Sequence, residues 1–240
     1  MRCGSNPDSR HRPRRLARAI AACLPAAGVT LGLLVAAPAA QADAWLREEG
    51  RSFLSFSVQS TAKGPDFGTY ASLFYEYGLT GRLTIGVDAG RNLASGDTSG
   101  LLFLRTPLST GRSAAAFELG LGAVETAAGL TAALRPGLAW GRSYDAPWGN
   151  GWVGLDASYA LYGTGAGLGK IDATFGVNHA SGALSVVQLQ YSAPSSGRST
   201  LAIAPSHVVK LSETLFLELG LVHEFRNRTT AVKLGMWTTF

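Results

Sequence analysis

Apolar side chains recur at every second position in several stretches of the chain. In 83–89, apolar residues occupy the odd positions and small or polar residues the even ones, and 153–159 and 171–177 repeat this pattern. The stretch 215–221 also follows it, with Phe216 as an exception. Successive side chains of a β-strand point to opposite faces, so each stretch predicts a strand with one apolar and one polar face.

Turn signals rich in Gly, Ser and Asp separate these stretches at regular intervals, as at 64–66, 95–97 and 195–197. Together they predict about twelve antiparallel strands, and a count of ten or fourteen also fits the pattern. The expected strands lie at residues 52–61, 68–77, 82–91, 99–107, 112–123, 130–142, 151–162, 168–178, 183–192, 199–209, 214–224 and 229–240. An even number of antiparallel strands is typical of bacterial transmembrane β-barrels.

The low content of charged residues distinguishes between two kinds of all-β fold. A soluble β-sandwich or lipocalin-like barrel also alternates, but it turns its apolar face inward and its charged face to water. Here charged residues make up only 15% of the chain, and the non-apolar face is rich in Gly. A sheet whose apolar side meets lipid accounts for this better. We therefore predict an all-β antiparallel transmembrane β-barrel with short loops, and keep the soluble barrel as the alternative.

The first 42 residues have the order of parts of a cleavable secretory signal peptide. Several Arg residues precede an apolar stretch at 19–39, and Ala40 and Ala42 form a small-x-small cleavage site before Asp43. A membrane anchor is the alternative, but the Ala- and Gly-rich stretch is only weakly apolar. We therefore divide the chain into a signal peptide at 1–42 and a transmembrane β-barrel at 43–240.

Removing the signal peptide changes the charge of the protein. The whole chain has a formal net charge of +5, but six Arg and one acidic residue lie within 1–42, which leaves 15 basic and 15 acidic residues. Nucleic-acid binding thereby loses its compositional support. Both cysteines, Cys3 and Cys23, also leave with the signal, so neither a disulfide nor a thiolate metal site is expected. The sequence shows no phosphate-binding loop and no metal-ligand spacing, so we expect no cofactor.

The last predicted strand ends the chain on an aromatic residue. Apolar residues at alternate positions precede Phe240, and Lys233 and Gly235 form a polar-x-glycine pattern. This resembles the C-terminal signature that outer-membrane barrels present to their assembly machinery, although Thr238 replaces an apolar or aromatic residue. The resemblance implies an assembly signal and a location in the outer membrane of a Gram-negative bacterium. Its residues are Lys233, Gly235, Met236 and Phe240.

A second resemblance lies in the segment 75–86, which reads Tyr-Glu-Tyr-Gly-Leu-Thr-Gly-Arg-Leu-Thr-Ile-Gly. It is similar to the "EYGLTDRLTLG" hairpin of poorly characterised proteobacterial barrels of the MetA-pathway-of-phenol-degradation or transporter type. Gly81 stands where that family often has Asp, which leaves the turn intact. The resemblance implies a barrel and a role in transport.

The polar faces of the predicted strands carry charged and amide side chains that would point into the barrel. They are Glu76, Asp88, Arg105, Glu118, Arg135, Asp156, Lys170, Asp172, Gln188, Gln190, Glu218 and Lys233. Charges persist in membrane-spanning segments only where they meet water or one another. They would therefore line a narrow aqueous pore or pair across the lumen and close it, and twelve strands do not decide between the two. We expect Arg105 and Arg135 to meet Glu118, which lies on the strand between theirs.

Three classes of function remain. The expected one is passive or selective passage of small solutes, with outer-membrane lipids and the barrel-assembly machinery as further partners. The alternative is a structural or interaction barrel with a closed, charged lumen. A lipid-modifying enzyme is least expected: His179 and Ser181 resemble the His-x-Ser of phospholipase and lipid A deacylase barrels, but Gly182 replaces the usual Asn. Because the segment is also predicted to be a turn, we expect no enzyme.

Overall fold

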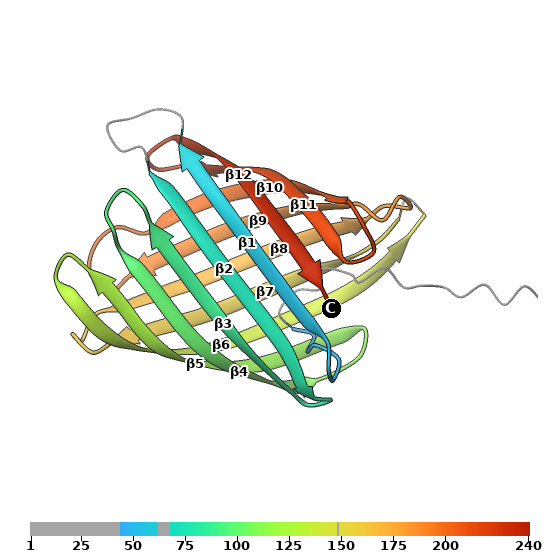
Figure 1. Cartoon of the computed structure of the whole chain (residues 1–240), viewed down its shortest axis with the longest axis horizontal. Helices are drawn as coiled ribbons and strands as arrows, with labels where there is room; N and C mark the ends of the chain where they lie inside the picture. Colours follow the sequence, from blue (N-terminus) through green and yellow to red (C-terminus); the bar gives the residue numbers. More distant parts are fainter. Residues whose placement is uncertain (1–43, 62–67, 148) are drawn as a thin grey trace, which may run out of the picture. The chain divides into compact units, whose positions relative to one another are not determined.

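The computed structural model describes residues 44–61, 68–147 and 149–240, which form a closed β-barrel (Figure 1). The predicted signal peptide, with Ala40 and Ala42, lies outside the described residues. The strands are β1 (Ser52–Thr61), β2 (Thr69–Thr80), β3 (Leu83–Asn92), β4 (Thr98–Ser109), β5 (Ser113–Thr126), β6 (Gly129–Ala146), β7 (Gly149–Tyr162), β8 (Gly167–Asn178), β9 (Leu184–Pro194), β10 (Thr200–Lys210), β11 (Leu215–Glu224) and β12 (Thr229–Thr239).

The barrel closes because the first and last strands pair with each other. β1 runs antiparallel to β12, with Phe53 opposite Thr239 and Thr61 opposite Ala231. Every other strand pairs with its neighbours in the sequence, so the closed sheet has no free edge. The predicted antiparallel barrel of twelve strands is thus confirmed. We call the end where β1 begins and β12 ends the terminal mouth, and the opposite end the far mouth.

One predicted turn is shorter in the structure. The sequence predicted a turn over 143–151, with Gly149 and Gly151 as turn signals between the expected strands 130–142 and 151–162. However, β6 continues to Ala146 and β7 begins at Gly149, so the turn lies within the predicted range but is shorter. In the structure, Gly151 is a strand residue that pairs with Tyr144, and a Cβ there would overlap the Tyr144 ring and the backbone of Gly176. Gly151 therefore serves close packing, and β6, with 18 residues, is the longest strand of the barrel.

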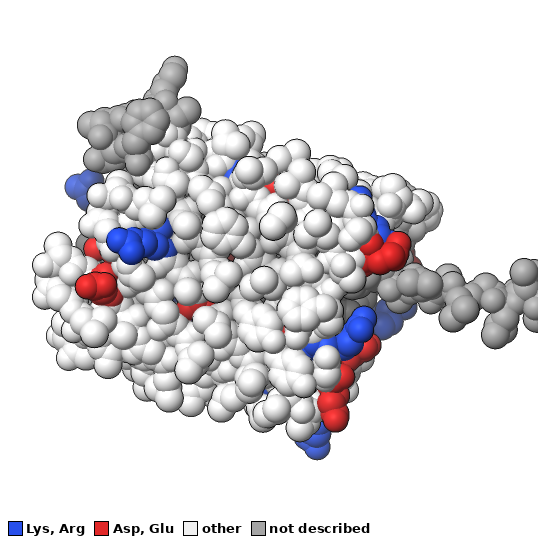
Figure 2. All heavy atoms as spheres, viewed as in Figure 1, with Lys and Arg blue, Asp and Glu red and all other residues white. Residues whose placement is uncertain are grey.

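The outer surface of the barrel is apolar between its two ends. Leu102, Leu121 and Leu138 are 67%, 59% and 56% exposed, and many other large apolar side chains share this surface. In the view of Figure 2, the coloured Lys, Arg, Asp and Glu atoms gather toward the two mouths, and the band between them is mostly white. This band has the character of a lipid-facing surface, because an apolar patch of this extent is rare on a soluble monomer.

The inner surface is not uniformly polar, which corrects part of the sequence interpretation. Near the terminal mouth, an apolar cluster forms inside the barrel from Trp152, Leu184, Val186, Val208 and Phe216, all 8% exposed or less. Phe216, the exception to the alternation of its strand, is 3% exposed because it points into this cluster. Alternation thus fixes which way a side chain points, but an inward position can be apolar wherever neighbouring side chains fill the barrel.

Within the described ranges, the structure has no helix that is both long and apolar enough to cross a membrane.

Candidate functional site

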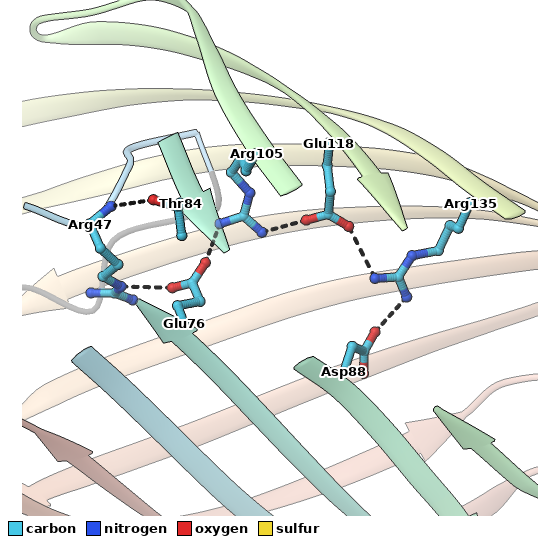
Figure 3. A network of polar contacts seen from close by, with 7 residues as sticks. All are labelled: Arg47, Glu76, Thr84, Asp88, Arg105, Glu118 and Arg135. Atoms are coloured by element: carbon cyan, nitrogen blue, oxygen red, sulfur yellow. Dashed lines mark hydrogen bonds and ion pairs between the residues drawn. The ribbon is translucent and has the colours of Figure 1, made fainter. Parts of the chain in front are cut away.

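A buried arginine joins two carboxylates inside the barrel (Figure 3). Arg105 on β4 forms ion pairs with Glu76 on β2 and, at 2.7 Å between Nη2 and Oε2, with Glu118 on β5. The Arg105 side chain is 1% exposed and the Glu76 side chain 2%. A buried charge is tolerated only when it is paired and hydrogen-bonded. Arg105 therefore compensates the charge of two carboxylates in this wall.

A second arginine continues the series. Arg135 on β6 donates to Glu118 at 3.0 Å between Nη2 and Oε1, and it also pairs with Asp88 on β3. Glu118 thus lies between two guanidinium groups, as the sequence predicted from the order of the strands. Asp88 and Arg135 are separated by β4 and β5. The curvature of the barrel wall and the length of the arginine side chain bring the two charged groups together.

The segment before β1 supplies the first member of the series. Arg47 donates from Nε to Glu76 Oε2 at 2.6 Å, and its backbone N–H donates to Thr84 at 3.1 Å. Its guanidinium carbon lies 4.5 Å from the centroid of the Phe53 ring. We call the six alternating charges the ion-pair chain: Arg47, Glu76, Arg105, Glu118, Arg135 and Asp88.

The same segment folds into the terminal mouth. Trp45 donates from its indole to the Gly111 carbonyl oxygen at 3.1 Å, and Ala44 is 1% exposed. A Cβ at Gly141 would overlap the Trp45 ring, and one at Gly78 would overlap the Glu48 backbone. Glycine at these two strand positions therefore lets the segment lie flat against the inner wall, where it narrows the mouth.

The wall formed by β11 and β12 carries a shorter polar cluster. Lys233 Nζ lies 2.8 Å from Glu218 Oε1, and the Trp237 indole donates to Glu218 Oε2 at 3.0 Å. Glu218 is 2% exposed. Gly235 leaves the space that this arrangement needs, because a Cβ there would lie 2.8 Å from Glu218 Oε2. Each carboxylate oxygen of the buried glutamate thus has a partner on β12.

The wall formed by β7 and β8 differs because two carboxylates are neighbours. Asp156 and Asp172 are direct cross-strand partners, and Ser158 and Lys170 are partners two residues further along. Like charges directly opposite each other destabilise a sheet. Asp172 forms no ion pair within the 4.0 Å limit among the residues that the structure describes.

Two cavities lie inside the barrel. The first, of about 270 Å³, lies toward the terminal mouth, where Phe53, Trp152, Lys233 and Trp237 contribute to its wall. The second, of about 150 Å³, is lined by Arg105, Glu118, Arg135 and Lys170 among others. Phe74, Asp156 and Asp172 line both cavities. The two cavities are therefore adjacent along the lumen and meet at these three residues.

The structure places the predicted lumen set as follows. Ten of the twelve residues line the first cavity, the second cavity or both. Glu76 lies in the ion-pair chain, and Gln190 donates a hydrogen bond to Gln188 at 3.3 Å. Three further residues line the first cavity but were not predicted from the sequence: Arg47, Phe74 and Trp152. Phe74 and Trp152 stand at inward positions of their strands, so period-two alternation could have found them. No strand pattern covers Arg47.

The proposed His-x-Ser pair is not formed by the residues that the sequence suggested. The hydrogen-bond partner of the His179 ring is Ser185, at 2.8 Å from Nε2, rather than Ser181. Ser185 also bonds His207 Nδ1 at 3.1 Å. The reason is the turn between β8 and β9, which turns the chain back after Asn178 so that His179 faces the first residues of β9. His207 on β10 therefore also belongs to this cluster at the terminal mouth.

The C-terminal strand presents the residues of the predicted assembly signal on both faces. Met236 and Phe240 are 51% and 57% exposed on the outer surface. Lys233 and Gly235 lie on the inner surface beside Glu218. A role in assembly stays a prediction.

Comparison with known proteins identifies the fold. No family model matches the sequence, and no curated protein matches it. Among solved structures, the KdgM porin superposes with a TM-score of 0.56 at 8% identity, covering 78% of this chain and 99% of that one. The NanC porin gives 0.55 at 9% identity, with 78% and 98% covered. An outer-membrane channel from Pseudomonas putida F1 gives 0.55 at 12% identity, with 82% and 98% covered.

These similarities extend over nearly the whole length of each known barrel. They do not confirm the narrower resemblance to barrels of the MetA-pathway type. The chain therefore has the fold of the outer-membrane porin and channel barrels.

Proposed function

We propose that this protein is a narrow channel for small solutes in the outer membrane of a Gram-negative bacterium. The fold and the apolar outer band support a membrane location. In this proposal the terminal mouth faces the periplasm, as both termini of bacterial barrels do. Residues 1–42 act as the export signal, and the C-terminal strand is recognised by the assembly machinery.

The observation that carries the proposal is a pair of buried donors in the cavity walls. The Trp152 indole N–H and the Arg135 Nε–H have no hydrogen-bond partner among the described residues. Trp152 lines the first cavity and Arg135 the second. A buried donor without a partner costs about 1–3 kcal/mol, and water normally satisfies such groups. The donors thus favour a hydrated lumen over a closed, dry one.

Electrical recording from the refolded barrel tests the proposal. In a planar lipid bilayer, we expect discrete conductance steps that persist at low voltage. Liposomes that contain the protein should also release trapped small solutes faster than empty liposomes. A correctly folded protein that gives neither steps nor release would favour the alternative, a structural barrel with a closed lumen.

A charge placed on the outer band tests the membrane location. We expect Leu102→Arg to lower the free energy of unfolding in phospholipid vesicles by about 2–4 kcal/mol, because an arginine near the bilayer midplane loses its hydration. Leu130 lies near the start of β6, at the far mouth, and is 75% exposed. The matched variant Leu130→Arg is expected to lower the free energy of unfolding by only about 0–1 kcal/mol. Urea titration gives both values. If both variants lost only a small and equal amount of unfolding free energy, the outer surface would be in contact with water and not with lipid.

Removing Arg135 tests whether the ion-pair chain narrows the lumen. Its side chain lines the second cavity and bridges Glu118 and Asp88. We expect Arg135→Ala to raise the single-channel conductance severalfold, since the truncation removes the bridge. Arg142→Ala, an exposed position on the same strand, serves as the control and should leave conductance unchanged. An unchanged conductance in Arg135→Ala would mean that the ion-pair chain does not limit flow.

A further inference from the structure

We infer that the lumen passes small hydrated cations in preference to anions, and that Asp156 and Asp172 set this preference. The inference rests on the proposed channel function and specifies the charge of its solutes. It follows from which basic side chains of the lumen are already paired, and from where the two cavities meet.

The basic side chains of the lumen are mostly neutralised. Both bases that line the first cavity have carboxylate partners: Arg47 pairs with Glu76, and Lys233 with Glu218. In the second cavity, Arg105 and Arg135 each lie between two carboxylates. An anion would have to displace one of these carboxylates to bind such a base. Lys170 is then the one cavity-lining base without an ion pair in the part of the chain that the structure describes.

The two aspartates lie where the two cavities adjoin. Asp156 and Asp172 are cross-strand partners on β7 and β8, and both line both cavities. Phe74 on β2 also lines both. β2 and β8 are six strands apart in a ring of twelve, so Phe74 faces the aspartates from the opposite wall. The place where the two cavities adjoin is therefore lined by an aromatic ring and two carboxylates.

The chemistry of this junction favours positive charge. Rings of Asp and Glu side chains are typical of cation-selective pores, and the face of an aromatic ring also attracts cations. A second observation indicates that the ion stays partly hydrated. The Trp152 indole N–H, in a residue 5% exposed that lines the first cavity, needs an oxygen acceptor that no described residue supplies. Water accompanying a cation would provide it, whereas a bare ion would not.

The test is the reversal potential of the refolded protein in a planar bilayer under a KCl gradient. We expect a permeability ratio of K⁺ to Cl⁻ on the order of threefold, since the carboxylates face the ion across a wet lumen of intermediate dielectric. The double variant Asp156→Asn/Asp172→Asn keeps the side-chain size and is expected to bring the ratio to about one or below. Asp145→Asn, at an exposed rim position paired with Arg112, is the control that should keep the wild-type ratio.

The variant Lys170→Gln provides an independent test, because it is expected to change the permeability ratio in the opposite direction to the double variant. It removes the unpaired base of the second cavity and is expected to raise the ratio of K⁺ to Cl⁻ above that of the wild type. This arm stays informative if the double variant fails to fold. The inference would be overturned if the currents showed no preference for cations, or if the preference were the same in both variants as in the wild type. The proposed channel function would still stand. A folded protein without any current would overturn the channel function itself.

Discussion

Replacing Arg105 by methionine is expected to lower the free energy of unfolding by about 3–5 kcal/mol, because breaking a buried ion pair leaves charge without compensation. Arg105 is 1% exposed, and it separates the Glu76 and Glu118 carboxylates. Methionine fills much of the same space, so the cost reflects charge rather than a cavity. Urea unfolding in lipid vesicles, followed by the gel shift between folded and unfolded barrel, measures the change.

The matched control is Arg112→Met. Arg112 pairs with Asp145 at 2.7 Å, but the two side chains are 69% and 75% exposed. Exposed pairs contribute about 0–1 kcal/mol, so this variant is expected to unfold almost as the wild type does. Adding Glu76→Gln to Arg105→Met should recover part of the loss, since it removes the charge of one of the two carboxylates that lose Arg105 as a partner. Equal costs for Arg105→Met and Arg112→Met would contradict a structural role for the ion-pair chain.

Local pairing explains why part of the ion-pair chain could be predicted from the sequence. β4, β5 and β6 are joined by short turns, so their registers follow from the alternation and the turn positions. Arg105 pairs directly with Glu118 across β4 and β5, and Arg135 stands opposite Gly120, one inward position along from Glu118. Both contacts therefore depend only on neighbouring strands, which period-two patterning specifies.

Contacts that depend on the closed barrel could not be predicted in the same way. Arg135 reaches Asp88 across two intervening strands, which needs the curvature of the wall. The apolar cluster around Trp152 and Phe216 forms from four different strands, β7, β9, β10 and β11, that meet only inside the closed sheet. The volume of the lumen depends on how such side chains pack. An alternating pattern specifies the face of each residue, but not how far its side chain extends into the interior.

The position of Arg47 is the most consequential feature that no sequence pattern indicated. Residues 44–51 precede the first strand and carry no alternation, so the pattern predicted no position for them. In the structure, Arg47 reaches Glu76 on β2 and Thr84 on β3. The glycines at 78 and 141 leave room for this segment, and their role becomes apparent only once the segment lies against them.

Releasing the segment before β1 is expected to raise the single-channel conductance severalfold. The variant Trp45→Ala/Arg47→Ala removes the indole hydrogen bond to Gly111 and the ion pair with Glu76. Arg47 lines the first cavity, so its truncation also widens the lumen directly. Glu49→Ala changes an exposed side chain of the same segment and is expected to conduct as the wild type does.

A labelling experiment separates release of the segment from simple widening. Cys3 and Cys23 both lie within 1–42, so refolded protein that begins at residue 43 has no cysteine. Ala44→Cys introduces one at a position that is 1% exposed. We expect a membrane-impermeant thiol reagent to label it slowly in the otherwise wild-type barrel, and rapidly when Trp45 and Arg47 are also replaced. Higher conductance with slow labelling would mean that the lost Arg47 side chain widens the lumen while the segment stays in the mouth. Fast labelling with unchanged conductance would place the narrowest point deeper, at the junction of Phe74 with Asp156 and Asp172.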